Sequence, residues 1–394
     1  MAENNHIPLA CSSWDDKESK AIEDVVNSGI FTMGSKVQEF EESFANYHNS
    51  KYCVMVNSGS SANFLMIAAL FFTKGKFRLK RGDEIIVPSV SWSTSYSPIY
   101  FHGLKLRFVD VDSKTLNINT DNIKEAITPN TKGILAVNLL GNSCEYNEIV
   151  SICNENDLIL LEDNCESLGG SYNNQKTGTF GLVSSCSSFF SHHISTMEGG
   201  LILTDDEEIY HILLSIRAHG WTRNLPENNL ICNKSEDPFY ESFRFILPGY
   251  NVRPLELSGA LGIEQIKKLD DLISKRRSNA EIFQNMMKDF DFIDIQEESG
   301  SSSWFGFGMV LNERAKFSRG SFIEKLKDGG IETRPIVCGN ILENEMTEYF
   351  DYSTYGDFTV SEKIHKDGLF VGNHHIDIKA GLENLHDCIC QLAK

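Results

Sequence analysis

The chain has 394 residues, 41% of them hydrophobic, which is enough for one large or two ordinary domains with real cores. Its 36 Lys and Arg residues against 55 Asp and Glu residues give a formal charge of −19, which argues against sequence-independent binding to nucleic acid or to anionic lipid. The longest apolar run, at residues 64–72, is too short to span a bilayer, and the first residues lack the pattern of a secretory signal. We therefore expect a cytoplasmic globular protein with no membrane partner.

The first motif, VNSGSSAN at residues 56–63, lies between an apolar run and the helix-like segment 64–72. A helix that begins with glycine and serine offers free backbone N–H groups and hydroxyls, which can bind a phosphate. The same pattern is also common in helix caps without a ligand. The motif is therefore a candidate phosphate site, and Gly59 and Ser60 are its candidate donors.

Short strand-like runs then alternate with segments of helical period. The runs cover residues 83–90, 104–112, 132–141, 157–164, 185–190 and 200–206. Such alternation predicts an α/β fold with a mostly parallel sheet and helices on both of its faces. The run LILLED at residues 158–163 is apolar on both faces, as is typical of a central parallel strand.

Two residues near strand ends are candidates for ligand contacts. Trp92, in VPSVSWSTS, follows a strand and could stack on a planar ring, although a packed indole is the more ordinary role. Asp163 ends the LILLED run at the edge of the sheet where open α/β folds bind ligands. Alone, Asp163 could equally cap a helix.

The stretch SSFFSHHISTMEGGLILTDD, residues 187–206, predicts a loop between two strands. The loop holds the adjacent histidines His192 and His193 and contains no lysine. Neighbouring residues of an extended segment point to opposite sides, so we expect only one of the two imidazoles to face a ligand.

After about Pro254 the pattern changes to long helical stretches followed by a shorter α/β pattern. We therefore expect a large domain at residues 1–255, and a linking helix with a smaller C-terminal α/β domain at residues 256–394. The ten cysteines are scattered without CxxC pairs, which indicates reduced thiols and no metal site. The close pair Cys388 and Cys390 has no neighbouring cluster that would complete an iron–sulfur site.

Taken together and in this order, these motifs resemble the DegT/DnrJ/EryC1/StrS aminotransferase family of pyridoxal-phosphate enzymes. The resemblance extends through LPGYNVRPLELSGALGIEQIKKLD, at residues 247–270, and covers nearly the whole chain. It implies the fold type I, aspartate aminotransferase-like architecture, pyridoxal 5'-phosphate or pyridoxamine 5'-phosphate as cofactor, and a homodimer with shared active sites.

The resemblance also implies roles for individual residues. Trp92 would stack on the cofactor ring, Asp163 would pair with the ring nitrogen, and Glu166 stands where the family usually has glutamine. The phosphate would be held by Gly59, Ser60 and Ser187, with Asn251 reaching the cofactor of the neighbouring subunit.

One residue departs from the family pattern. The lysine that binds the cofactor covalently lies six positions before the glutamate of EGG, and here that position is His192. An imidazole cannot form the imine that lysine forms, but it can still carry a proton. This departure resembles the sugar 3-dehydratases of the family, with His192 as the catalytic base and His193 as the alternative.

The same resemblance implies the reaction and its substrates. L-glutamate would supply the amino group, a GDP-linked 4-keto-6-deoxy-D-mannose would lose its C3 hydroxyl, and 2-oxoglutarate and ammonia would be released. Candidate contacts to the sugar or to carboxylates are His219, Arg223, Arg253, Glu332 and Arg334. Three alternatives stay open: a nucleotide-sugar aminotransferase, a CDP-sugar 3-dehydratase with an iron–sulfur cluster and a reductase partner, and a cofactor-binding regulator.

Overall fold

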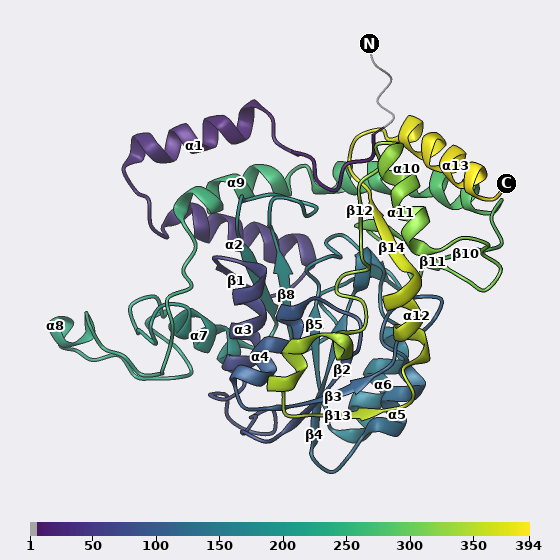
Figure 1. Ribbon diagram of the computed structural model, residues 1–394. Helices are drawn as coiled ribbons and strands as arrows, with labels where there is room; N and C mark the ends of the chain where they lie inside the picture. The colour runs from purple at the N-terminus through teal and green to yellow at the C-terminus, as the bar shows by residue number, and fades with distance from the viewer. Residues whose placement is uncertain (1–5) are drawn as a thin grey trace.

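The computed structural model describes residues 6–394, and its centre is an eight-stranded sheet with the order β1-β9-β8-β5-β4-β2-β3-β13 (Figure 1). In that order the strands are Tyr52–Val56, Gly200–Thr204, Val183–Ser187, Ile159–Asp163, Thr131–Val137, Glu84–Pro88, Lys105–Val109 and Tyr352–Tyr355. Strand β9 is antiparallel to both of its neighbours, and the strands from β8 to β13 are parallel. The six strands expected from the sequence therefore all form, and the mostly parallel sheet is confirmed.

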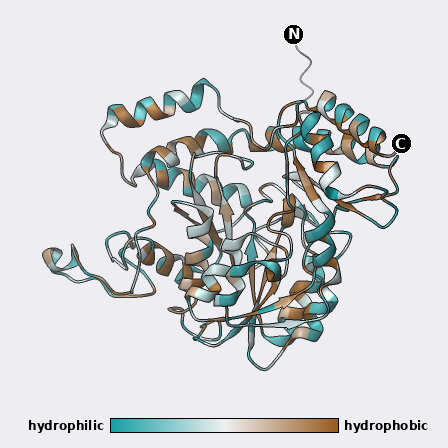
Figure 2. Cartoon of the chain, in the orientation of Figure 1, coloured by the Kyte–Doolittle hydropathy of each residue, from teal (hydrophilic) through white to brown (hydrophobic). Residues whose placement is uncertain are grey.

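Helices cover both faces of this sheet because its strands are apolar on both sides. Ile85 and Val87 of β2 belong to the core on one face, whereas Ile86 between them packs into the core on the other face. This is the two-residue period of a strand. Figure 2 shows the result as largely hydrophobic strands between helices that are hydrophilic on their outer sides. The covering helices are α2 Ser35–His48, α3 Gly59–Ala69, α4 Ser93–Phe101, α5 Thr120–Ala126, α6 Tyr146–Asn156 and α7 Glu207–Ile216.

A smaller antiparallel sheet, in the order β10-β11-β14-β12, lies beside the large one (Figure 1). Its strands are Ile293–Ile295, Gly306–Leu311, Gly368–Gly372 and Thr333–Arg334. The α-helices from residue 256 onward are α9 Glu256–Ile266, α10 Leu269–Met287, α11 Arg319–Asp328, α12 Thr359–Asp367 and α13 Lys379–Leu392. The chain after residue 256 is not confined to this smaller unit, because β13 returns to the edge of the large sheet and pairs with β3.

The remaining elements lie around these two sheets. They are α1 Asp16–Ser28, α8 Pro238–Glu241, the two-stranded β6 Ser171–Tyr172 and β7 Gln175–Lys176, and the short 3-10 helices η1 Leu139–Gly141, η2 Ile341–Glu343 and η3 Glu345–Tyr349. Figure 1 shows α8 at the end of an arm that projects from the body of the protein. Among residues 6–394, no helix is both long enough and apolar enough to cross a membrane.

Candidate active site

A cavity of about 360 Å³ opens at the edge of the large sheet where the parallel strands end. Eight of the residues singled out in the sequence line it: Gly59, Ser60, Trp92, Asp163, Glu166, Ser187, His192 and Arg334. Among the described residues that line the cavity, none is a lysine. The sheet topology explains the convergence, because parallel strands bring their carboxyl ends to one edge.

The floor of the cavity contains the N-terminus of helix α3. Ser58 caps this helix, and its hydroxyl accepts a hydrogen bond from the Ser61 N–H at 3.1 Å. A Cβ atom on Gly59 would lie 2.8 Å from the Ser187 Cβ, so strand β8 reaches the helix start only because residue 59 is glycine. First-turn N–H groups without intrahelical partners, together with the hydroxyls of Ser60 and Ser187, form a donor set suited to a phosphate.

Asp163 is a buried carboxylate group in the lining of the cavity. Its Oδ2 accepts hydrogen bonds from Asn63 Nδ2 and from Ser95 Oγ, each at 2.8 Å, and its Oδ1 accepts one from the Cys165 N–H at 3.2 Å. A buried carboxylate whose two oxygens are held by hydrogen bonds is suited to pair with a protonated ring nitrogen, and the exposed Trp92 side chain lines the same cavity.

Glu166 is a second carboxyl group with different surroundings. Its Oε2 accepts a hydrogen bond from the Leu140 N–H at 2.8 Å, and burial raises the pKa of its carboxyl to about 7. Leu140 has a φ of 53° inside the turn Leu139–Gly141, and its N–H is directed at the Glu166 carboxyl group. At neutral pH Glu166 is therefore partly protonated and can donate a hydrogen bond, as the amide of a glutamine does.

The position of His192 fixes which of its ring nitrogens can act as a base. Its Nδ1 lies 2.8 Å from the Cys165 carbonyl oxygen, which only accepts hydrogen bonds, so Nδ1 carries the proton and Nε2 has a free lone pair. Burial lowers the pKa of His192 to about 4, with a further contribution from Arg276. The imidazole is therefore neutral at physiological pH and able to accept a proton.

The side chain of His193 does not line the cavity. It is buried outside the cavity, with its Nε2 3.3 Å from the Ser303 carbonyl oxygen. The segment is not extended as expected from the sequence, because the His192 N–H bonds the Phe189 carbonyl across a turn at 2.9 Å. The two imidazoles therefore diverge because the loop turns.

The other predicted contact residues lie outside the cavity of this chain. His219 bonds the Tyr250 carbonyl through its N–H at 2.8 Å, and Arg253 Nε donates to Asn251 Oδ1 at 3.0 Å. Arg223 lies over the ring of Trp221, next to the same segment. These four residues (His219, Arg223, Asn251 and Arg253) thus form a separate group.

Glu332 faces the N-terminal segment instead of the cavity. Its carboxylate accepts a hydrogen bond from the Leu9 N–H at 2.9 Å and lies 3.8 Å from His6 Nε2. A role in sugar or cofactor contact within this chain is therefore not supported by its position.

Several residues of the site were not predicted. The Cys165 carbonyl and the Leu140 N–H orient His192 and Glu166, and Phe305 packs against His192 with 5.0 Å between the ring centres. Backbone groups leave no signal in residue identity, and Phe305 comes from a distant part of the sequence. Asn63 belongs to the VNSGSSAN motif, but nothing in that motif pairs it with Asp163.

Comparison with known proteins gives close matches. The model of the DegT/DnrJ/EryC1/StrS aminotransferase family matches residues 12–379. A GDP-4-keto-6-deoxy-D-mannose 3-dehydratase from Yersinia pseudotuberculosis is 57% identical over 98% of each chain. A protein of the same name from Escherichia coli O55:H7 is 57% identical over 97% of this chain and 99% of its own.

Solved structures agree in fold. A GDP-4-keto-6-deoxymannose-3-dehydratase with a trapped PLP-glutamate geminal diamine superposes with a TM-score of 0.95 at 56% identity, covering 97% of this chain and 100% of that one. The aminotransferase PseC of Helicobacter pylori, at 22% identity, has a TM-score of 0.86 over 98% of this chain and 99% of its own. These matches confirm the fold type I architecture expected from the sequence.

Proposed function

Because the chain belongs to the DegT/DnrJ/EryC1/StrS aminotransferase family, we propose that it is a pyridoxal-phosphate-dependent lyase acting on a nucleotide sugar. Its reaction removes the C3 hydroxyl of GDP-4-keto-6-deoxy-D-mannose and gives GDP-4-keto-3,6-dideoxy-D-mannose. The observation that carries the proposal is His192, a neutral imidazole that lines the cavity in the sequence position of the family lysine. The 57% identity to two proteins named for this reaction supports the same conclusion.

A bound pyridoxal phosphate would supply a carrier for the amino group of L-glutamate and an electron sink for the loss of the C3 hydroxyl from the 4-keto sugar. The overall reaction balances. Glutamate is oxidised to 2-oxoglutarate and ammonia, the sugar is reduced by the same two electrons as its C3 oxygen leaves as water, and one water is consumed in hydrolysis. No other oxidant or reductant is required.

His192 moves the proton in both halves of this reaction. Its Nε2 lone pair accepts a proton, while the Cys165 carbonyl keeps Nδ1–H and the ring plane fixed. The conjugate acid of a group with a pKa near 4 releases its proton readily, which suits the protonation of a departing hydroxyl. Binding of an anionic cofactor brings negative charge into the cavity and would raise this pKa toward the working pH.

The other cavity residues would hold the cofactor. Ser60, Ser187 and the start of α3 suit the phosphate, and Asp163 suits a protonated ring nitrogen. Glu166 can donate a hydrogen bond to a ring hydroxyl while it is protonated. Arg334 is a permanently cationic side chain on the cavity wall, so we assign it to a carboxylate of glutamate or to a phosphate of the nucleotide sugar.

The group formed by His219, Arg223, Asn251 and Arg253 is best explained by a homodimer with shared active sites. Large apolar side chains near this group are exposed in the single chain, including Phe239 at 88%, Phe243 at 70% and Tyr250 at 68%. Such a surface is typical of a subunit interface. In the dimer these polar residues would complete the cavity of the partner subunit.

We place the reaction in the cytoplasm. All ten cysteines are free thiols, which is the usual state in a reducing compartment.

The proposal is tested by the mass of the sugar product. Purified protein, pyridoxal phosphate, glutamate and GDP-4-keto-6-deoxymannose should give a nucleotide sugar that lacks one oxygen atom relative to the substrate. A product in which an amine has replaced the ketone, with the C3 hydroxyl retained, would identify an aminotransferase. Cofactor binding without any change in the sugar would identify a regulator.

A further inference from the structure

The loop that carries His192 is anchored at Ser195 by two side chains from distant parts of the chain. The Ser195 N–H donates to Gln265 Oε1 at 2.9 Å, and the Ser195 carbonyl accepts from the Trp14 indole N–H at 3.1 Å. Ser195 is 1% exposed and lies three residues after His192. Buried backbone groups need such partners, so both bonds constrain where this part of the loop can lie.

Gln265 is fixed in one orientation by its own partners. Its Oε1 also accepts from Ser13 Oγ at 2.6 Å, and its Nε2 donates to Glu18 Oε1 at 2.7 Å and to the Ser13 carbonyl at 3.3 Å. The Ser195 N–H requires an acceptor, and the Glu18 carboxylate requires a donor, so the amide cannot flip without losing both bonds. Gln265 is fully buried and thus joins the loop to the N-terminal segment rigidly.

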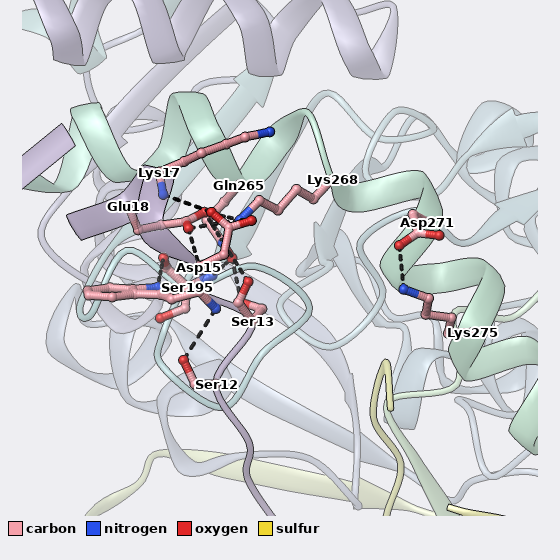
Figure 3. Close-up of polar contacts among 11 residues, drawn as sticks. Ser12, Ser13, Asp15, Lys17, Glu18, Ser195, Gln265, Lys268, Asp271 and Lys275 are labelled. Atoms are coloured by element: carbon pink, nitrogen blue, oxygen red, sulfur yellow. Dashed lines mark hydrogen bonds and ion pairs between the residues drawn. The ribbon is translucent and has the colours of Figure 1, made fainter. Parts of the chain in front are cut away.

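We name residues 12–18 the N-terminal strap. Glu18 closes the first turn of α1 through a capping box with Asp15, and it is fully buried. Lys268, at the junction of α9 and α10, lies 2.7 Å from Glu18 and 2.8 Å from Asp15. Figure 3 shows these side chains converging with Ser13, Gln265 and Ser195 in one connected network. Hydrogen bonds and ion pairs therefore connect the strap both to α9 and to the histidine loop.

The other bonds of the loop close its base, whereas Ser195 anchors the part of the loop that follows His192. The base of the loop is closed by the bond from the Phe190 N–H to the Met197 carbonyl at 3.0 Å and by the pair Ser188 and Thr196. Between these bonds, the His192 Nδ1 lies 2.8 Å from the Cys165 carbonyl and the His192 N–H bonds the Phe189 carbonyl, and Ser195 is the next point along the chain that is held by distant side chains. A shift of Ser195 would move the ring relative to Cys165.

We infer that Trp14 and Gln265 are positioning residues for His192, and that the N-terminal strap holds the histidine loop in its working conformation. This inference rests on the proposed function, in which His192 moves the proton. Neither residue lines the cavity, so they act through Ser195. The charged groups that act on His192, Asp163 and Arg276, do not contact Trp14 or Gln265 through any hydrogen bond or ion pair within residues 6–394.

The first test compares Trp14→Phe and Gln265→Leu with the control Lys275→Ala. Lys275 pairs with Asp271 at 2.6 Å on the exposed side of α10, and this pair is separate from the network in Figure 3. Misplacement of a catalytic group by about 1 Å can cost roughly 100-fold in rate. We expect kcat for 2-oxoglutarate release to fall by about 10- to 100-fold in both strap variants, with KM for glutamate and cofactor content unchanged. The control should match the parent protein.

The second test needs no turnover. Diethyl pyrocarbonate modifies neutral imidazoles, and peptide mass spectrometry can follow its rate at His192 in cofactor-free protein between about pH 5 and 8, on either side of the ordinary histidine pKa. In the parent, this rate should not depend on pH, because the His192 imidazole is neutral over the whole range. In the strap variants the rate should instead decrease below about pH 6.5, where a solvated imidazole becomes protonated.

The two tests separate the possible outcomes. In one outcome, the strap variants lose thermal stability and yet keep the parent's kcat per cofactor-loaded site and its His192 modification profile. That result would overturn the inference and show that the network is only structural. A parent protein that releases no 2-oxoglutarate would overturn the proposed function instead, while the modification profile would still test the positioning of His192.

Discussion

Replacement of His192 by asparagine should remove proton transfer and leave the other properties of the site unchanged. The amide of the introduced asparagine can still donate to the Cys165 carbonyl, which in the parent lies 2.8 Å from the ring Nδ1, but it has no lone pair that accepts a proton at neutral pH. Asp163, Ser60 and Ser187 keep their positions, so we expect cofactor affinity within about twofold of the parent.

The expected loss of rate follows from the role of the base. A positioned general base contributes about 10²- to 10⁴-fold, which corresponds to roughly 3 to 5 kcal/mol of barrier. Since the same nitrogen serves both halves of the reaction, His192→Asn should lower 2-oxoglutarate formation and ammonia release together. Both products can be measured in one reaction mixture with coupled dehydrogenase assays.

His193→Asn is the matched control for this substitution. His193 is buried outside the cavity and contacts the Ser303 carbonyl, so its replacement should cost about 1 to 2 kcal/mol of stability but leave substantial activity per folded site. If His192→Asn keeps near-normal ammonia release while His193→Asn abolishes it, the assignment of the base is wrong and His193 carries the proton.

Three further predictions concern the cofactor, the assembly and acid stability. Borohydride should not fix the cofactor to the parent protein, whereas His192→Lys should gain a covalent, visibly absorbing link and lose most dehydration; a stable adduct in the parent would contradict this. Sedimentation should show a homodimer, and an active monomer would count against the shared site. Burial lowers the pKa of His48 from 6.5 to about 4, so the unfolded chain binds more protons between these two values and stability should fall as the pH falls through that window. For this fully buried group the loss approaches about 3 kcal/mol, and urea titrations should show a shallower acid loss for His48→Asn.

Much of the fold was predictable because most strands of the large sheet have a local sequence pattern that indicates a strand. Strands such as β2 and β5 are continuous apolar runs, and parallel strands necessarily bring their ends, and hence Asp163, to one edge. Strand β13 was not predicted, because its sequence YSTY has neither an apolar run nor clear alternation. It is an edge strand that forms only through pairing with β3, which lies far earlier in the chain, and a tertiary contact of this kind has no local signal.

The candidate site was likewise predictable in part from the sequence. The identity of His192 and its spacing to Glu198 pointed to the imidazole that lines the cavity, but the turn bond from the His192 N–H to the Phe189 carbonyl and the contacts of the ring with Cys165 and Phe305 left no signal in the sequence. Glu332 was expected to approach the cofactor side of the site; it does not line the cavity of this chain, and its carboxylate accepts a hydrogen bond from the Leu9 N–H.

The fate of the glutamate nitrogen tests the central claim most directly. Glutamate carrying a heavy-isotope label on its nitrogen would be incubated with GDP-4-keto-6-deoxymannose, cofactor and the parent protein, and both free ammonium and the nucleotide sugar would be analysed by mass spectrometry. A dehydratase built around His192 returns the label as ammonium in a one-to-one ratio with 2-oxoglutarate and leaves a 3-deoxy sugar without it. Recovery of the label in the sugar, with no free ammonium, would contradict the account.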